Sequence, residues 1–385
     1  MAPATVAMTP RRIRVVHVVN NLNYGGMERL VAELVTRTDP ARFEMHVLAL
    51  GYMGHFGEGL DTLATLHVAD PMPSWSMLHP RGLARQFAAM RPDVAHLHSG
   101  VLYKASLAAS MAGVPYQVYT DHGRQNPDPW THRMIDRRAA RRVDAIVAVS
   151  DRLKQHLVEF MPDPTRISVI PNGVDTERYS PRDDDGDFRG ELGITRDVPI
   201  IGSVGRLEPI KGYEVLIRAF AKLRSTWATS PAPVLVLVGD GSERAMLEQS
   251  AAALGIVDSV RFVGWRSDIE RMTRAFTLFS MSSHSEGTSV SLLEAMSSGL
   301  CPVVTDVGGN AAVLGTELQH RLVPAADPDA LALALSGAVR DSAARIRDAA
   351  AARQRVVNAF GLDAMVARYD ALYTAGCDAA GHYRG

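Results

Sequence analysis

Short runs of apolar and β-branched residues alternate along the chain with longer stretches in which apolar residues recur at helical spacing. This alternation is typical of βα units that form parallel sheets. The runs in the first half predict strands at residues 14–19, 44–50, 95–98, 116–120, 145–149 and 167–170. The stretches between them predict helices at residues 26–38, 81–90, 103–112, 133–142 and 152–160.

A turn and a linker are expected between this series and a second one. Residues 171–175 (PNGVD) have the composition of a turn, and the acidic stretch 181–190 resembles a linker. Beyond it, strands are predicted at residues 199–204, 234–238, 260–263, 278–281 and 301–305. The last stretch, 343–373, has a helical pattern with a break near Phe360 and Gly361. We therefore predict two doubly wound, Rossmann-like α/β domains facing a central cleft, with ligands at the carboxyl ends of the strands.

The composition indicates a globular protein and argues against several functional classes. A chain of 385 residues is too long for one ordinary core, and 46% of it is hydrophobic. The formal net charge of −1 gives no reason to expect a nucleic-acid partner. Cys301 and Cys377 stand in unrelated contexts, which argues against a disulfide framework or a cysteine metal site. Because no apolar run approaches 18 residues, we expect a cytoplasmic protein, with peripheral membrane contact left open.

Two carboxylates, Glu286 and Glu294, stand eight positions apart across a Gly-Thr-Ser turn that leads into a helix-forming run. If the helix begins near Ser289, Glu294 lies about 7.5 Å along its axis. Free N–H groups at a helix start attract an anion such as a diphosphate. The layout therefore predicts a nucleotide-sugar site, with phosphates on the N–H groups and sugar hydroxyls on the carboxylates.

A second charged motif follows the strand predicted at residues 199–204. Within the segment 205–212 (GRLEPIKG), Arg206 and Lys211 stand where two cations could neutralise a diphosphate. The alternative for this segment alone is a solvated loop with a glycine at a helix start. Together with the glutamate pair, the two cations favour the diphosphate site.

Glycines follow the first predicted strand and open a helix. Gly25 and Gly26, in the segment 23–28 (NYGGME), permit close approach of the backbone to a ligand. Neither this segment nor 239–244 (GDGSER) matches the Gly-x-Gly-x-x-Gly fingerprint, which argues against a dinucleotide oxidoreductase. A plain tight turn is an equally good interpretation of each segment by itself.

Histidines stand at the end of two predicted strands. His122 could hydrogen-bond a sugar hydroxyl or stabilise developing charge there, although a lone histidine is more often structural. The pair His96 and His98 resembles a metal-binding pair. We expect their rings to lie on opposite faces of the strand, and the sequence has no matching acid or third ligand nearby, so no metal site is predicted.

A basic cluster occupies the helix predicted at residues 133–142, where five arginines accompany one aspartate. It could meet an anionic lipid surface or a polyanionic acceptor. A solvated helix face is the commoner meaning of such a charge run. The arginines are Arg133, Arg137, Arg138, Arg141 and Arg142.

Taken in order, these motifs resemble the family 4 retaining glycosyltransferases of GT-B fold, from about residue 13 to residue 375. The ordered set comprises Gly25-Gly26, His122-Gly123, 171–175, 205–212, 238–241 and the Glu286/Glu294 pair, which is the most specific member. Residues 286–310 most resemble bacterial enzymes that build exopolysaccharides or lipid-linked glycans. The chain departs from the family pattern after residues 308–310 (GGN), where no acid follows within a few positions.

The resemblance implies roles for the matching donor-side positions. Arg206 and Lys211 would bind the donor diphosphate, and Glu294 would bind the ribose. Glu286 would hold hydroxyls of the donor sugar. The neighbouring backbone would shape the donor pocket at Gly287, Thr288 and Ser289.

The same resemblance places the remaining residues and the domains. Val263 would face the base, His122 would lie at the reaction centre, and Gly25 and Gly26 would border both acceptor and phosphate. Residues 1–177 would form an acceptor-binding domain and residues 178–360 a donor-binding domain. The final helix, 361–385, would cross back to the first domain.

We therefore expect a retaining transfer of a sugar from a nucleoside-diphosphate donor, UDP-linked, to a hydroxyl of a glycan, lipid-linked or small-molecule acceptor. Arg206, Lys211, Glu286 and His122 would carry the catalysis, mainly by stabilising the departing diphosphate. No metal or other cofactor is expected. The rival hypotheses are a nucleotide-sugar epimerase of the same fold and a non-catalytic nucleotide- or glycan-binding module.

Overall fold

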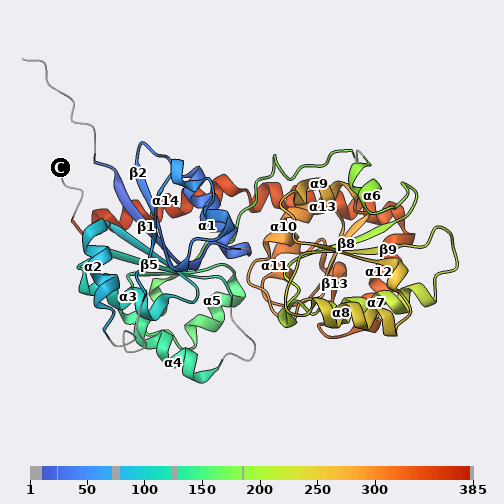
Figure 1. Ribbon diagram of the computed structural model, residues 1–385, viewed down its shortest axis with the longest axis horizontal. Coiled ribbons are helices and arrows are strands. Elements are labelled where there is room, and N and C mark those ends of the chain that lie inside the picture. Colours follow the sequence, from blue (N-terminus) through green and yellow to red (C-terminus); the bar gives the residue numbers. More distant parts are fainter. Residues whose placement is uncertain (1–10, 24, 72–78, 124–128, 184–185, 382–385) are drawn as a thin grey trace, which may run out of the picture.

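The computed structural model describes residues 11–23, 25–71, 79–123, 129–183 and 186–381. These residues form two parallel sheets, each covered by helices on both faces (Figure 1). The predicted α/β architecture with two doubly wound, Rossmann-like domains is confirmed.

The first sheet has the strand order β3-β2-β1-β4-β5-β6-β7. Its strands are β1 (Ile13–Asn21), β2 (Phe43–Tyr52), β3 (Thr65–Val68), β4 (Val94–His98), β5 (Tyr116–Asp121), β6 (Ala145–Ala148) and β7 (Ile167–Val169). The helices between them are α1 (Gly26–Arg37), α2 (Arg81–Met90), α3 (Leu102–Met111), α4 (Trp130–Ala139) and α5 (Asp151–Val158). Every predicted strand and helix of this half is present, and β3 is the one strand within the described residues of this half that the apolar pattern did not predict.

Alternation along the central strands fills the core on both faces of this sheet. In β1, Val15 and Val19 pack on the side covered by α1 and α14 (Leu362–Ala379). Val16 and Val18 pack on the opposite side, against α2, α3 and α5. A parallel sheet buried on both faces needs such nearly continuous apolar strands.

The second sheet has the order β10-β9-β8-β11-β12-β13. Its strands are β8 (Ile200–Val204), β9 (Val234–Val238), β10 (Val260–Gly264), β11 (Leu278–Met281), β12 (Pro302–Thr305) and β13 (Leu322–Val323). Its helices are α6 (Asp187–Glu191), α7 (Tyr213–Ser225), α8 (Arg244–Ala253), α9 (Ile269–Ala275), α10 (Val290–Ser297), α11 (Asn310–Leu314), α12 (Pro328–Arg340) and α13 (Ser342–Ala359). All five predicted strands are confirmed, and β13 is again a short strand at the sheet edge that was not predicted.

The expected linker at residues 181–190 is only partly a linker. Residues 187–191 form helix α6, whose Phe188 is buried in the core of the second domain. The prediction was wrong here because one aromatic residue anchors an otherwise acidic segment. Asp184 and Asp185, in the same stretch, lie outside the described residues.

The chain passes between the two domains twice, and the two crossings run side by side. The helical C-terminal stretch breaks at residues 360–361, as predicted, so that α13 ends at Ala359 and α14 begins at Leu362. At the break, the N–H of Val174 donates to the carbonyl oxygen of Phe360 at 2.9 Å. The N–H of Leu362 donates to the carbonyl oxygen of Val174 at 3.0 Å. Beyond this point α14 lies along the first domain (Figure 1).

Candidate active site

The order of strands in the second sheet brings two distant motifs together. Residues 205–212 follow β8 and residues 282–289 follow β11, and β8 pairs with β11. The N–H of His284 donates to the carbonyl oxygen of Ile210 at 2.8 Å, so the two loops are joined. Lys211 Nζ consequently lies 2.6 Å from Glu286 Oε1. The hydroxyl of Ser283 donates to the same carboxylate oxygen at 2.6 Å and fixes its position.

Arg206 lies in the first of these loops with its side chain exposed. Its guanidinium makes no hydrogen bond or ion pair with a described residue. Its positive charge acts on Glu28 of α1, which belongs to the first domain. Burial raises the pKa of Glu28, while a backbone hydrogen bond and the positive charge of Arg206 act in the opposite direction. Arg206 is therefore a cation at the edge where the two domains meet.

Helix α10 begins as the sequence predicted. Ser289 is its N-cap, and the Ser289 hydroxyl accepts a hydrogen bond from the N–H of Leu292 at 3.4 Å. Gly26, at the start of α1, faces the start of α10: a Cβ on Gly26 would lie 3.4 Å from Val290 Cγ2. The starts of α1 and α10 therefore meet across the domain interface.

Glu294 is buried in α10 and is already paired. Its Oε1 lies 2.5 Å from Nη1 of Arg29, which belongs to α1 of the first domain. The same guanidinium donates to the hydroxyl of Tyr179 at 2.6 Å. Burial raises the pKa of Glu294, and the charge of Arg29 opposes that shift. Sequence reasoning missed Arg29 and Tyr179, because nothing local distinguishes them from an ordinary helix arginine and a core tyrosine.

The segment Gly287-Thr288 is held by the first domain and by the crossing. The Thr288 hydroxyl donates to the carbonyl oxygen of Val149. The Thr288 carbonyl oxygen accepts a hydrogen bond from Nδ2 of Asn172 at 2.7 Å. A side chain at Gly287 would overlap the carbonyl oxygen of His122, so glycine is required there for the close approach of the two domains. Asn172 belongs to the predicted turn 171–175, one of the motifs that carry the family resemblance, but the sequence predicts no contact for it.

The remaining predicted residues lie around this interface. Gly25 is the residue before α1, and Tyr24, next to it, lies outside the described residues. Val263 is partly buried in β10, which ends at the same sheet edge as β8 because both strands pair in parallel with β9. The structure thus brings Arg206, Lys211, Glu286 and the start of α10 together on the second domain, and places His122 against Gly287.

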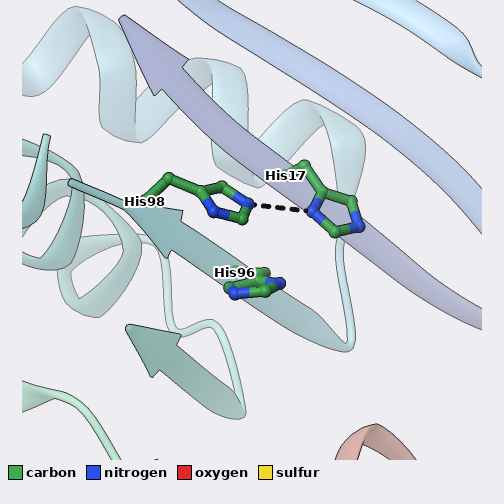
Figure 2. A group of neighbouring side chains, drawn as sticks. All are labelled: His17, His96 and His98. Atoms are coloured by element: carbon green, nitrogen blue, oxygen red, sulfur yellow. Dashed lines mark hydrogen bonds between the residues drawn. The ribbon is translucent and has the colours of Figure 1, made fainter. Parts of the chain in front are cut away.

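The two histidines of β4 do not lie on opposite faces of the strand, and that expectation was wrong. Residues two positions apart on a strand share a face, because side chains alternate with period two. The rings of His96 and His98 have centroids 4.1 Å apart. A third ring, His17 of β1, lies beside them, with Nδ1 3.1 Å from Nε2 of His98 (Figure 2). His17 is thus a third imidazole nearby, which was not expected. Neither the opposite faces of the two histidines nor the lack of a third ligand holds, and the absence of a metal site remains a prediction.

His122, which is partly buried, is bonded to this buried group. Its Nε2 lies 3.0 Å from Nδ1 of His98. His96 is bonded on both ring nitrogens, to the hydroxyl of Tyr373 at 2.7 Å and to that of Thr120 at 2.8 Å. His122 is thus not a lone histidine at a strand end but the outermost ring of a cluster, a fact that appears only when the strand order is known.

Two Rossmann-like domains whose facing edges carry cations, carboxylates and a histidine define the GT-B class of glycosyltransferase. The chain belongs to glycosyltransferase family 4: Glycosyltransferase Family 4 matches residues 24–178, and Glycosyl transferases group 1 matches residues 184–355. It is therefore a retaining glycosyltransferase that uses a nucleotide-sugar donor. This membership disfavours both the epimerase and the non-catalytic module.

Two relatives and one solved structure illustrate the likeness. A UDP-Gal:alpha-D-GlcNAc-diphosphoundecaprenol alpha-1,3-galactosyltransferase of Escherichia coli is 30% identical over 293 residues, covering 73% of this chain and 75% of that protein. A D-inositol 3-phosphate glycosyltransferase of Stackebrandtia nassauensis is 31% identical over 308 residues, covering 73% and 68%. The crystal structure of Anabaena HepE in complex with UDP and glucose superposes with a TM-score of 0.81 at 21% identity, covering 94% of this chain and 100% of that one.

Proposed function

We propose that the protein transfers a sugar from a UDP-linked donor to a hydroxyl of a lipid-linked or other glycan acceptor in bacterial polysaccharide or glycolipid biosynthesis. The observation that carries the proposal is the contact of Lys211 with Glu286 at the edge where the loops after β8 and β11 meet. The choice of UDP is supported by the E. coli relative, named for UDP-Gal, and by Anabaena HepE, solved with UDP and glucose.

Donor binding would rearrange this ion pair. Lys211 and Glu286 neutralise one another in the structure. A diphosphate would take Lys211 and the exposed guanidinium of Arg206 as its cations, with the N–H groups at the start of α10 as further donors. Glu286, held by Ser283, would then be free to accept hydrogen bonds from the donor sugar. Stabilising the leaving diphosphate is the main catalytic contribution that this arrangement can make.

Ribose binding would require the domains to move apart and close again. Glu294, the proposed ribose ligand, is occupied by Arg29 of the opposite domain. A ribose hydroxyl would replace Arg29, and this requires α1 to move away from α10, since the two helix starts are so close that a Cβ on Gly26 would touch Val290. Donor entry is therefore coupled to opening of the interface, as in other enzymes that enclose their substrates.

The acceptor would enter on the first-domain side of the interface. A cavity of about 490 Å³ is lined by Asn23, Met53, Gly54, His55, Gly57 and Glu58. The ring of His55 meets that of Trp265, from the second domain, edge to face at 4.7 Å. Asn23, which lines the cavity, is close to Gly25 and Gly26 in sequence, and the cavity borders the other domain. We therefore assign the acceptor to this cavity. Glu58→Ala should raise the acceptor KM and leave donor hydrolysis unchanged; an equal change in both would place the acceptor elsewhere.

Helix α4 offers a surface for a membrane that holds such an acceptor. None of the helices in the described part of the chain has the length and apolarity to cross a bilayer. On α4, however, Trp130 is 69% exposed and Met134 is 59% exposed. Arg138 and Arg141 are exposed beside them. Exposed apolar side chains flanked by arginines suit the anionic headgroup layer, so we place the protein at the cytoplasmic face of the membrane.

The proposed reaction is tested with purified protein and a panel of nucleotide-sugars. UDP-sugars should support donor hydrolysis or transfer, and Lys211→Ala and Glu286→Ala should each reduce the rate sharply. Lys222→Ala is the matched control, because Lys222 pairs with Asp329 on the exposed surface, at 2.5 Å. Near-normal rates in both site variants would contradict the assignment.

The same panel separates the rival functions. Conversion of a UDP-sugar to its epimer in the absence of any acceptor would favour the epimerase. Tight UDP binding without turnover of any donor would favour the binding module.

The membrane contact is tested by co-sedimentation with vesicles. Binding should be stronger to anionic than to neutral vesicles, and a Trp130→Ser, Arg138→Ser variant should lose it. Leu333→Ser is the control, since Leu333 is 77% exposed on α12, in the other domain. Equal binding to both vesicle types would argue against the contact.

A further inference from the structure

The buried imidazoles of His17 and His98 and the partly buried imidazole of His122 form one hydrogen-bonded chain that ends at the interface. His17 Nδ1 lies 3.1 Å from His98 Nε2, and His98 Nδ1 lies 3.0 Å from His122 Nε2. The two end atoms, Nε2 of His17 and Nδ1 of His122, are buried and have no hydrogen-bond partner among the described residues. The chain therefore runs from the centre of the first sheet to the residue that packs against Gly287.

All three rings are neutral in the folded protein. Burial lowers the pKa of His17 and of His122 to about 3, and lowers the pKa of His98 well below its ordinary value. A neutral imidazole has one N–H group and one acceptor nitrogen. Each ring in the chain must therefore donate on one side and accept on the other, so the three tautomers can change only together.

The two possible directions differ at the ends of the chain. In one, His17 donates to His98 and His98 donates to His122, which leaves His17 Nε2 as an unpaired acceptor and His122 with its hydrogen on Nδ1. In the reverse direction, His17 would hold an unpaired N–H among apolar side chains such as Val15 and Val19. Each direction leaves one N–H without a partner, on His122 Nδ1 in the first and on His17 Nε2 in the reverse. His17 is fully buried, whereas His122 is only partly buried beside the interface, so the unpaired N–H costs less at His122 and the first direction is favoured.

We propose that His98, itself oriented by His17, is a positioning residue that holds His122 as the Nδ1–H tautomer. His122, whose carbonyl oxygen lies against Gly287, then carries a hydrogen-bond donor, and not a base, on the ring nitrogen that is not bonded to His98. The inference rests on the proposed function for the role of His122, where such a donor would bind an oxygen of the donor sugar or of its phosphates. The orientation of a histidine by a buried partner is a general device for setting its tautomer.

A metal ion in this cluster is the competing explanation. Nitrogen atoms of His17, His96 and His98 lie within 4.8 Å of one another. Both nitrogens of His96 are, however, already bonded to Tyr373 and Thr120. Both ring nitrogens of His98 are likewise bonded, one to His17 (Figure 2) and the other to His122. The geometry thus favours a hydrogen-bonded chain over three ligands.

The tautomer of His122 can be read directly, without turnover. In the full-length protein labelled with ¹⁵N-histidine, long-range ¹H–¹⁵N correlation distinguishes protonated from unprotonated ring nitrogens, and His122→Gln assigns the signal. We expect Nδ1 of His122 to be protonated in the wild type. In His98→Phe the hydrogen should move to Nε2 in most molecules, and in His98→Gln, whose amide can donate to His122, it should return to Nδ1.

Kinetics of the same variants supply a second readout. His98→Phe should lower kcat by about tenfold or more with little change in the donor KM, and His98→Gln should recover most of the loss. His67→Phe is the matched control, because His67 stacks on His46 in the same sheet at a centroid distance of 5.3 Å but is not joined to His122.

Several outcomes would overturn the inference. They are a wild-type His122 protonated on Nε2, a His122 signal unchanged by His98→Phe, or about one metal ion per chain in the purified protein by elemental analysis. Absence of any transfer activity would contradict the proposed function, but it would leave the tautomer result standing.

Discussion

The two halves of the site are made from different kinds of polar contact. On the second domain, charged groups are paired: Lys211 with Glu286, and Glu294 with Arg29 from across the interface. On the first domain, the polar groups behind His122 are neutral rings and hydroxyls. A charged ligand can replace one member of an ion pair, whereas a neutral chain fixes which atom donates. The donor half is therefore suited to exchange, and the acceptor half to orientation.

Breaking the ion pair of the donor half should have the largest effect. Lys211→Ala and Glu286→Ala should each lower kcat/KM for the donor by about 100-fold or more, because each removes a group that acts on the departing diphosphate or its sugar. The double variant should cost little more than either single one, since the two residues act on one ligand as a unit. Fully additive losses would mean that the two residues act independently, and would contradict an ion pair that is exchanged for the donor as a unit.

Acid should affect the first domain before the second. Burial lowers the pKa of His17 and His122 to about 3, against an ordinary value of 6.5. The unfolded chain therefore binds protons that the folded chain does not. The contribution of each neutral ring to the free energy of unfolding is therefore fully present above pH 6.5. It falls by about 1.4 kcal/mol per pH unit as the pH drops toward 3.

Hydrogen exchange at several pH values between 7 and about 5 measures this difference. Amides of β1 and β4 should lose protection before those of β8 and β11. A variant with His17 and His98 both replaced by Phe should be less sensitive to acid. Loss of protection in the second sheet first, or in both sheets together, would contradict the expectation.

Removing Arg29, the first-domain partner of Glu294, should have a smaller effect on donor use, and should improve donor binding where the previous variants reduce kcat/KM. In Arg29→Gln the carboxylate no longer has to leave an ion pair before it binds ribose. The donor KM should fall by about fivefold, or about 1 kcal/mol, because the closed, donor-free arrangement loses a contact that the open one does not make. X-ray scattering without donor should show a larger radius of gyration.

Arg42→Gln is the control for this substitution, since Arg42 contacts Thr374 on the exposed surface of the first domain. A donor KM that rises in Arg29→Gln would show that Arg29 assists donor binding and does not compete with it.

Thr288→Val should give the smallest change. It removes the hydrogen bond from the Thr288 hydroxyl to the carbonyl oxygen of Val149 and should lower the free energy of unfolding by about 1 kcal/mol in a urea titration. Thr36→Val, which removes an exposed bond to the carbonyl oxygen of Ala32, should change it by less than about 0.5 kcal/mol. Equal effects would mean that the interdomain bond contributes nothing beyond an ordinary surface contact.

Most of the fold was predictable from the apolar pattern because central parallel strands are buried on both faces and read as continuous runs. The two missed strands, β3 and β13, are edge strands of four and two residues, too short for such a signal. The linker prediction failed at Phe188, where a single buried ring determines the structure of an acidic segment.

The site was predictable where residues of one domain follow neighbouring strands, as Lys211 and Glu286 do. The contacts of Arg29 and Asn172 could not be predicted, because they cross the domain interface and depend on how two separate sheets face one another. The error over His96 and His98 was of another kind: strand periodicity, correctly applied, places them on one face. Their neighbour His17 required the pairing of β1 with β4 as well.

The paired crossings between the domains have a mechanical consequence. A single strand of chain would let one domain swivel in any direction. Two crossing segments that are bonded to each other at Val174 and Gly361 act as a hinge with one axis. The domains can rotate about that axis, and twisting in other directions is resisted. Cleavage of one crossing would leave the halves joined by the other, and Glu294 would meet the same face of α1 each time they swing shut.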